Sequence, residues 1–178
     1  MSPVSLRELG ERFAQQGELR WIGVRPAQGA PMTVLDQVDS IAGRGLAGDR
    51  TALRGTGRER QVTLFQFEHL AVIASLLGRE RLAPELLRRN LGVSGINVLA
   101  LRSRRFSIGG LTLQGTGYCA PCRRLEETLG RGGFNASRGH GDITARLLGA
   151  GSIRIGDSVA VLLAGADAQE TDDPDHDF

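Results

Sequence analysis

Residues 105–114 read RFSIGGLTLQ, and this stretch decides the fold class. Two runs of β-forming residues, RFSI and LTLQ, flank the glycine pair Gly109 and Gly110. Glycine adopts the positive φ that tight hairpin turns require, so the stretch predicts a β-hairpin. Residues 153–162, IRIGDSVAVL, repeat the order of strand, Ile-Gly turn and strand, and they predict a second hairpin.

Several other short runs carry the composition or the alternation typical of strands. They are residues 19–25, 32–38, 61–66, the run that follows Asn90, and 143–147. Helical signals are fewer, and the first of them begins with a capping-box pattern at Ser5 and Glu8. The expected helices are residues 5–16, 68–77, 84–90 and 121–129. Because no strand–helix–strand succession recurs, we predict a mostly β, barrel-like domain with a few short helices, a β-rich α+β fold.

The 178 residues suffice for one domain with its own core. We expect an N-terminal helical segment over residues 1–18, the main domain over 19–165 and a tail over 166–178. The tail holds six acidic residues and no basic one, and we expect it to be disordered. The rest of the chain has 22 basic residues against fourteen acidic ones, which favours a small anionic ligand.

The chain contains no lysine, because all 22 basic residues are arginines. This excludes a lysine Schiff base, hence covalently held pyridoxal phosphate, and it excludes a Walker A loop. Arginine instead offers planar, bidentate recognition of phosphate or carboxylate groups. Aromatic and basic residues do not interleave as they do on stacking surfaces, so we expect no nucleic-acid partner. With no long apolar run and no signal-peptide core, we expect no membrane partner.

The two cysteines of the chain, Cys119 and Cys122, are spaced C-x-x-C. Two cysteines do not make a disulfide framework, so we expect a reducing cytoplasm. A redox dithiol fits the spacing, but the surrounding βαβ pattern of such proteins is missing. Half of a zinc site would need two further ligands from among His69, His140 and His176. The cysteines could also be small buried hydrophobes.

A single working thiolate is the remaining interpretation. Cys122 is predicted in the first turn of the helix over residues 121–129, next to Arg123 and Arg124. Unpaired helix N–H groups and cationic neighbours favour the thiolate form of a cysteine. A soft thiolate suits a transition metal, and the glycine-rich loop over residues 41–50 suits a phosphate-bearing cofactor.

Six short motifs resemble, in their order and spacing, those of the MOSC domain, the module named after the C-terminal domain of molybdenum-cofactor sulfurases. They are residues 45–50 (GLAGDR), 87–96 (LRRNLGVSGI), 106–109 (FSIG), 119–122 (CAPC), 136–141 (ASRGHG) and 153–157 (IRIGD). The motifs span roughly residues 20–163, nearly the whole main domain. The chain resembles the small stand-alone members, which lack the sulfurases' pyridoxal-phosphate half.

The resemblance implies a β-rich barrel that holds a molybdenum–pterin cofactor or passes sulfur to one. In the family, one cysteine ligates molybdenum or bears a persulfide. The family pattern is Pro-Cys, a basic or aromatic residue, any residue and then an apolar one, and it matches residues 121–125 (PCRRL). The resemblance thereby assigns the metal-ligand and catalytic role to Cys122. His140 is the second catalytic candidate, as a proton donor. The resemblance also implies cofactor-binding residues, namely Asp49, Arg50, Arg89, Asn90, Cys119 and Arg138.

The expected function is therefore a molybdenum-cofactor-dependent oxidoreductase that reduces N-hydroxylated compounds. Since no flavin or iron–sulfur motif is found, separate electron-transfer proteins would supply the electrons. One alternative is a sulfur carrier, loaded by a sulfur-donor protein, with a persulfide on Cys122. Another is a non-catalytic module that binds an anion or the cofactor.

Overall fold

The computed structural model describes residues 4–140 and 142–162. The predicted acidic tail over residues 166–178 lies outside this range. The strands are β1 (Gly17–Val24), β2 (Thr33–Leu35), β3 (Gln37–Ile41), β4 (Gly45–Leu46), β5 (Val62–Gln66), β6 (Leu91–Ser94), β7 (Arg105–Ile108), β8 (Leu111–Cys119), β9 (Asp142–Leu147), β10 (Gly151–Arg154) and β11 (Ser158–Val161). The α-helices are α1 (Leu6–Gly10), α2 (His69–Leu76), α3 (Arg123–Leu129) and α4 (Gly133–Ala136). The 3₁₀ helices are η1 (Arg50–Arg54), η2 (Pro84–Leu87) and η3 (Val98–Leu101).

Seven strands close into a barrel in the order β1-β11-β7-β8-β9-β5-β6, and β6 returns to β1. Within this barrel β5 and β6 are parallel, whereas the other neighbours are antiparallel. β2 extends the barrel sheet beside β1, and β10, β3 and β4 form a separate three-stranded sheet. The mostly β, barrel-like fold with few short helices that the sequence predicts is therefore confirmed.

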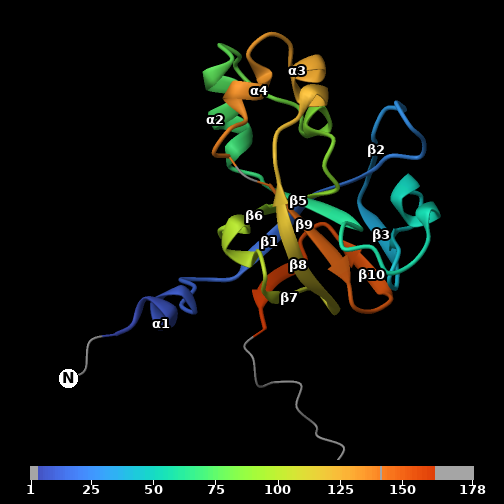
Figure 1. The fold of residues 1–178 in the computed structure, drawn as a ribbon, viewed down its shortest axis with the longest axis vertical. Coiled ribbons are helices and arrows are strands. Elements are labelled where there is room, and N and C mark those ends of the chain that lie inside the picture. The colour runs from blue at the N-terminus through green and yellow to red at the C-terminus, as the bar shows by residue number, and fades with distance from the viewer. Residues whose placement is uncertain (1–3, 141, 163–178) are drawn as a thin grey trace, which may run out of the picture.

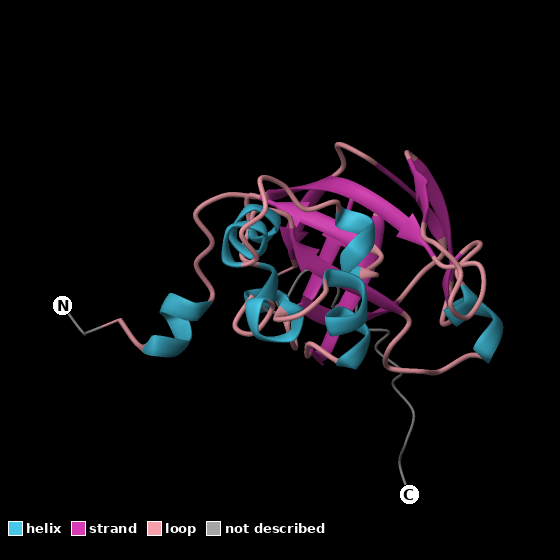
Figure 2. Cartoon of the chain, turned by 90° about the horizontal axis from the view of Figure 1, so that it is seen from above, coloured by secondary structure: helices cyan, strands magenta, loops and turns pink. Residues whose placement is uncertain are grey.

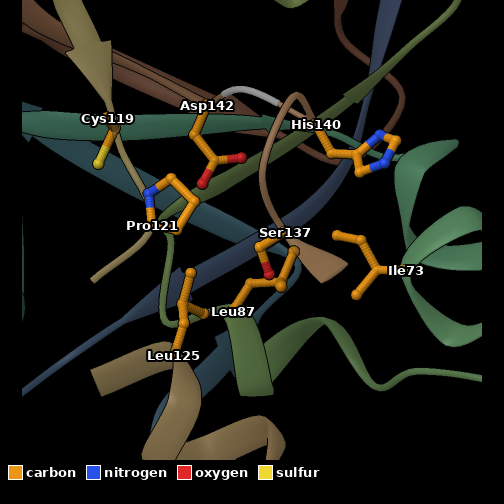
Figure 3. A pocket seen from close by; sticks show the side chains of 8 residues that line it. All are labelled: Ile73, Leu87, Cys119, Pro121, Leu125, Ser137, His140 and Asp142. Carbon is orange, nitrogen blue, oxygen red and sulfur yellow. The ribbon is translucent and has the colours of Figure 1, made fainter. Parts of the chain in front are cut away.

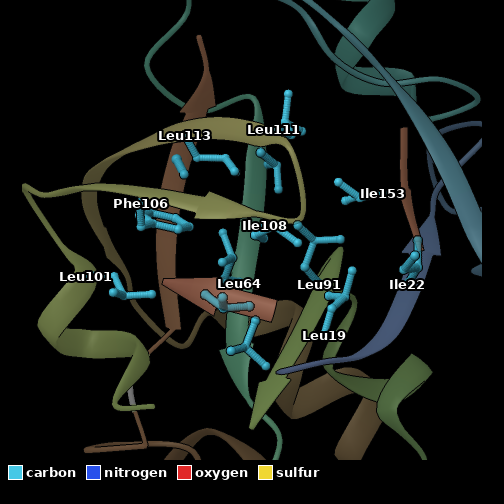
Figure 4. Close-up of a cluster of buried hydrophobic side chains, with 14 of the residues drawn as sticks. Leu19, Ile22, Leu64, Leu91, Leu101, Phe106, Ile108, Leu111, Leu113 and Ile153 are labelled. Atoms are coloured by element: carbon cyan, nitrogen blue, oxygen red, sulfur yellow. The ribbon is translucent and has the colours of Figure 1, made fainter. Parts of the chain in front are cut away.

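Buried aliphatic side chains fill the barrel, with Phe106 among them (Figure 4). They come from alternate positions of the strands, as the two-residue period of a half-buried strand requires. A second cluster lies between the barrel and the helices, where Trp21 and Phe65 pack edge to face at 5.8 Å between ring centroids. This cluster holds α2, α3 and α4 together over one end of the barrel (Figures 1 and 2).

The hairpin predicted over residues 105–114 is confirmed, since β7 and β8 pair through Ile108 and Leu111. The second predicted hairpin is wrong. β10 pairs with β3, whereas β11 pairs with β7 and β1. At the Ile-Gly turn, Ile155 N donates to Asp36 O and Gly156 N to Leu19 O. These hydrogen bonds to residues distant in sequence fix the turn at which the chain leaves the three-stranded sheet after β10 and enters the barrel at β11.

The N-terminal helix is shorter than its periodicity predicts. The capping box is present, with Ser5 Oγ accepting from Glu8 N and the Glu8 carboxylate accepting from Ser5 N. The helix ends at Gly10 rather than at Gln16, and none of its residues is buried. Short helices depend on packing against a neighbour, and α1 lies to one side of the barrel (Figure 1) with no buried residue, where Arg104 Nη2 donates to Gly10 O at 2.9 Å.

Candidate functional site

The two cysteines lie at the two ends of the short segment that connects β8 of the barrel to α3 of the helical cap. Cys119 is the last residue of β8 and lies opposite Asp142 of β9. Cys122 is exposed and is the N-cap residue of α3, where its carbonyl accepts from Leu125 N. It therefore precedes the first turn of the helix, whereas the sequence predicts it within that turn. The structure separates the cysteines into one buried and one accessible thiol.

The thiol of Cys119 lies among cationic side chains. The residue is 3 % exposed, and Arg60 Nη2 donates to its Sγ at 3.2 Å. Burial raises the pKa of Cys119, and the nearby Arg89 and Arg60 oppose the rise without cancelling it. Cys119 is accordingly a protonated, enclosed thiol at neutral pH.

We expect a thiol reagent to distinguish the two cysteines. Iodoacetamide at pH 8 should modify Cys122 quickly and Cys119 only on opening of the fold, because alkylation requires an accessible thiolate. Intact-mass spectrometry over time should show one fast adduct, which is lost in Cys122→Ser and kept in Cys119→Ser. Two adducts formed at equal rates would contradict the different burial of the thiols.

Arg89 and Asp142 form a buried ion pair below the cysteine segment. Arg89 Nε donates to the Asp142 carboxylate, and the two side chains are 5 % and 11 % exposed. Burial disfavours the charged guanidinium, but Asp142, together with Cys119 and Cys122, outweighs this effect and raises the pKa of Arg89. The other end of the guanidinium points to the carbonyls of Cys119 and Ala120, each 3.4 Å from Nη2. One ion pair thus ties the segment between η2 and β6, and the start of β9, to the backbone that leads to Cys122.

Asn90 and Asp49 are the centre of a buried polar network. Asn90 Nδ2 donates to Asp49 Oδ2 at 2.9 Å, and Asp49 also accepts from the backbone and Nε of Arg25. Asp49 Oδ1 caps η1 by accepting from Thr51 N. Burial opposes ionisation of Asp49, but Arg25 and these hydrogen bonds together lower its pKa. Asp49 and Asn90, both predicted as site residues, therefore fix the Arg25 side chain and the backbone at Gly23, Arg25 and Thr51.

An open cavity of about 270 Å³ lies above this network. We call it the arginine cavity; its lining residues are Arg25, Arg50, Thr51, Arg54, Arg60, Gln61, Val62, Thr63 and Asn90. Arg88 lies nearby, and its pKa is lowered by burial and by the positive charges of Arg25, Arg124 and Arg50. The arginines outnumber the nearby carboxylate of Asp49, which is already hydrogen-bonded to Arg25 and Asn90, and they create a strongly positive electrostatic potential in the cavity. The chemistry of the cavity suits a phosphate or another multiply charged anion.

A small inner pocket lies between the barrel end and the cap (Figure 3). Its lining residues are Ile73, Leu87, Cys119, Pro121, Leu125, Ser137, His140 and Asp142. Cys119 connects the two spaces, because it lines the inner pocket and its Sγ contacts Arg60 of the arginine cavity.

The structure thus gathers most of the predicted residues, in two groups. Arg50 and Asn90 line the arginine cavity, and Cys119 and His140 line the inner pocket. Arg138 and Cys122 are both exposed and lie outside both linings, although Pro121, next to Cys122, lines the inner pocket.

Sequence reasoning missed three residues of this region: Arg25, Arg60 and Asp142. Each lies at the end of a predicted strand, where a polar side chain draws no attention. Their partners are distant in the chain, since Arg60 is 59 residues from Cys119 and Arg89 is 53 residues from Asp142. The signal in the sequence is their position: Arg25 is the last residue of the predicted strand over residues 19–25, and Arg60 and Asp142 directly precede those over 61–66 and 143–147.

Of the other cysteine interpretations, that of a small buried hydrophobe fits Cys119, which is buried, but not Cys122, which is exposed. Both cysteines are free thiols. Among residues 4–140 and 142–162, no three His, Cys, Asp or Glu side chains gather to hold a metal ion, so a zinc site has no ligand set there. His176, one of the ligands considered, lies outside those residues. Within the same ranges, no helix is long and apolar enough to cross a membrane.

Comparison with solved structures shows which proteins share this fold. The YuaD protein from Bacillus subtilis matches with a TM-score of 0.69 and 21% identity, over 84% of this chain and 98% of that one. YiiM from Escherichia coli matches with a TM-score of 0.65 and 16% identity, over 86% and 72% of the two chains. YiiM from Geobacillus stearothermophilus gives a TM-score of 0.65 and 16% identity, over 85% and 78%.

Sequence comparison shows the family. No curated protein matches the chain significantly. The model of the MOSC domain matches residues 50–160, more than half of the chain, and this range contains Asn90, Cys119, Cys122 and His140. With the closed barrel and the ordered motifs, this match shows that the chain belongs to the MOSC domain family.

Proposed function

We propose that this MOSC domain binds a molybdenum–pterin cofactor and reduces N-hydroxylated compounds, with Cys122 as the thiolate ligand of the metal. The family as a whole is associated with the molybdenum cofactor. The observation that carries the proposal is the arginine cavity directly beside the cysteine segment. Arg60 joins them, because it lines the cavity and donates to Cys119 Sγ.

The residues present fit such a cofactor. A pterin cofactor of this kind carries a phosphate, for which Arg25, Arg50 and Arg54 offer charge-assisted hydrogen bonds. A metal needs a soft ligand that is free to bind, and Cys122 is an exposed free thiol. Cys119, buried and bonded to Arg60, suits a supporting role better than ligation.

The chain's own groups orient and shield the reaction. The cofactor supplies two-electron oxygen-transfer chemistry when bound. Arg89 fixes the carbonyls of Cys119 and Ala120 and so orients the segment that presents Cys122. Arg123 and Arg124 beside Cys122 are paired with Glu127 at 3.3 and 3.2 Å, so their positive charge at the thiol is partly offset. We propose that a separate protein in the cytoplasm donates the electrons.

A catalytic assay tests the proposal. Protein from a host that makes the cofactor should reduce an N-hydroxylated amidine to the amidine and water, with a reduced viologen as the electron donor. Cys122→Ser should abolish this turnover, whereas Glu18→Gln, a change on an exposed part of β1, should leave it intact. Cofactor-loaded protein that turns over no N-hydroxylated compound would contradict the oxidoreductase proposal.

A sulfur carrier is the second candidate, and the exposed thiol of Cys122 favours it. Such a protein would hold cyanide-releasable sulfur on Cys122 and no stoichiometric molybdenum. Cold cyanolysis of the freshly purified protein, beside metal analysis of the same sample, separates the two candidates.

The arginine cavity gives a prediction that applies to cofactor binding. In Arg50→Gln/Arg54→Gln, the affinity for the pterin should fall roughly tenfold for each arginine–phosphate hydrogen bond removed, because a hydrogen bond to a charged group contributes about 1.5 kcal/mol or more. The pterin that copurifies with the protein should fall with this affinity. Arg20→Gln is the matched control, since Arg20 is exposed on β1 and pairs with Glu18 at 3.2 Å. Equal pterin content in all three proteins would show that the phosphate binds elsewhere.

A further inference from the structure

Two histidines far apart in the sequence meet at the helical cap. His69 is the first residue of α2, and His140 follows α4. Their ring centroids are 4.9 Å apart with an interplanar angle of 73°, an edge-to-face contact. The sequence alone points to a role for His140 only, because a single histidine on a helix is most often structural. The contact with a second imidazole changes the chemistry available to both.

The pair lies between two spaces of different character. His69 lines a wide outer cavity of about 600 Å³, whose other polar lining residues are Gln15, Gln66, Glu68 and Asn97. His140 lines the inner pocket together with Asp142 and Cys119 (Figure 3). The two imidazoles therefore connect an open, polar cavity with the enclosed pocket that meets the arginine cavity at Cys119.

One ring nitrogen of the pair has an unused hydrogen-bonding capacity. His69 Nδ1 is buried and has no hydrogen-bond partner among the described residues. A buried polar nitrogen without a partner is costly, and such an atom points to a transient partner such as a water molecule or a transferred proton. Neighbouring Glu68 is fixed by Gly95 N at 2.7 Å and Gln66 Nε2 at 2.6 Å, which places a carboxylate at the start of α2.

The charged and titratable groups around the pair come from four elements. They are Glu68 at the start of α2, Asp142 on β9 with its partner Arg89 before β6, and Cys119 on β8. Arg89 neutralises Asp142, so the groups that act most directly on His140 are the protein interior and His69. Burial lowers the pKa of His140, and the positive charge of His69 lowers it further. Two imidazoles this close repel each other when both carry a proton, so the protonation of His140 depends on its neighbour.

We propose that His69 and His140 are relay residues that pass protons from the outer cavity to the inner pocket. The inference rests on the proposed function, because the reduction of an N-hydroxylated compound consumes protons: R–NHOH + 2 e⁻ + 2 H⁺ → R–NH₂ + H₂O. The N–O bond breaks, the donor protein supplies both electrons, and the substrate oxygen leaves in water. The protons come from solvent in the outer cavity. His69 takes up a proton there, and His140 passes it to the inner pocket.

Nuclear magnetic resonance tests the coupling without any cofactor. The chain has three histidines, so His69→Gln, His140→Gln and His176→Gln each remove one imidazole signal and assign all of them. In the wild-type protein, His140 should titrate below the ordinary histidine value near 6.5. His69→Gln should move its titration upward, because a like charge is removed, whereas His176→Gln should not move it. A His140 titration that is the same in His69→Gln overturns the proposal.

The pH dependence of turnover by cofactor-loaded protein tests the relay itself. General acid–base groups contribute on the order of 100-fold or more, so His140→Gln should lower kcat by that factor and remove the limb of the profile that follows the His140 titration. His69→Gln should shift the same limb upward. Coupled titrations with an unchanged kcat profile in both variants overturn the relay. Protein without molybdenum would overturn the proposed function instead, and the titrations would still decide whether the pair is coupled.

Discussion

Asp142→Asn is expected to lower the free energy of unfolding by about 3–5 kcal/mol, because it leaves the buried charge of Arg89 without its partner. Asparagine has nearly the same shape as aspartate, so the change isolates the charge. Both side chains of the pair are almost fully buried, and no water can replace the lost carboxylate cheaply. Urea unfolding at pH 7, followed by circular dichroism, measures the loss.

Two further variants make this prediction specific. Glu59→Gln removes the partner of Arg146 from a surface pair whose side chains are 65% and 44% exposed, and it should cost less than about 1 kcal/mol. Arg89→Met/Asp142→Leu removes both buried charges and should be more stable than Asp142→Asn. If Asp142→Asn lowered the free energy of unfolding no more than Glu59→Gln does, the prediction that the buried ion pair is needed for stability would be wrong.

Asn90→Asp should destabilise the protein by at least about 3 kcal/mol, because one buried donor becomes an acceptor that faces two other acceptors. The amide of Asn90 now donates to Gly23 O at 3.0 Å and to Asp49 Oδ2 at 2.9 Å. Its carbonyl accepts from Thr63 and Arg25, and the residue is 1% exposed. A carboxylate at this position would face the Asp49 carboxylate directly.

The same variant predicts a pH dependence. A buried carboxyl at position 90, close to Asp49, would take up a proton more readily than in the unfolded chain, so its folded-state pKa would be raised. The protonated form can donate to Asp49, and the stability gap to the wild-type protein should narrow as the pH falls from 7 to 5. Asn97→Asp is the matched control, because Asn97 is an exposed N-cap where aspartate serves equally well. Equal losses at positions 90 and 97 would contradict the buried network.

Local sequence signals predict the features of the fold that local chemistry determines. The glycine pair after Ile108 specifies the β7–β8 hairpin, and Ser5 with Glu8 specifies the start of α1. The identical Ile-Gly signal at Ile155 and Gly156 leads instead from one sheet to another. Its turn is decided by Asp36 and Leu19, which local periodicity does not reveal.

The candidate site shows the same division. The cysteine spacing and the glycine-rich loop indicate two regions of the candidate site, and the resemblance to MOSC domains relates them to one cofactor. The contacts that define the site are long-range, as with Arg60 on Cys119 and His69 on His140. No single-sequence pattern brings these pairs together, because each depends on how the barrel and its helical cap place segments that are far apart in the chain.

The molybdenum and pterin content of Cys122→Ser, in protein from a cofactor-competent host, is the decisive test of metal ligation by Cys122. Elemental analysis and the fluorescence of the oxidised pterin are measured beside the wild-type protein and Cys119→Ser. We expect stoichiometric molybdenum in the wild-type protein, substantial retention in Cys119→Ser, and loss of the metal from a fully folded Cys122→Ser. Wild-type levels of molybdenum in Cys122→Ser, or its loss from Cys119→Ser alone, would contradict the assignment of Cys122 as the metal ligand.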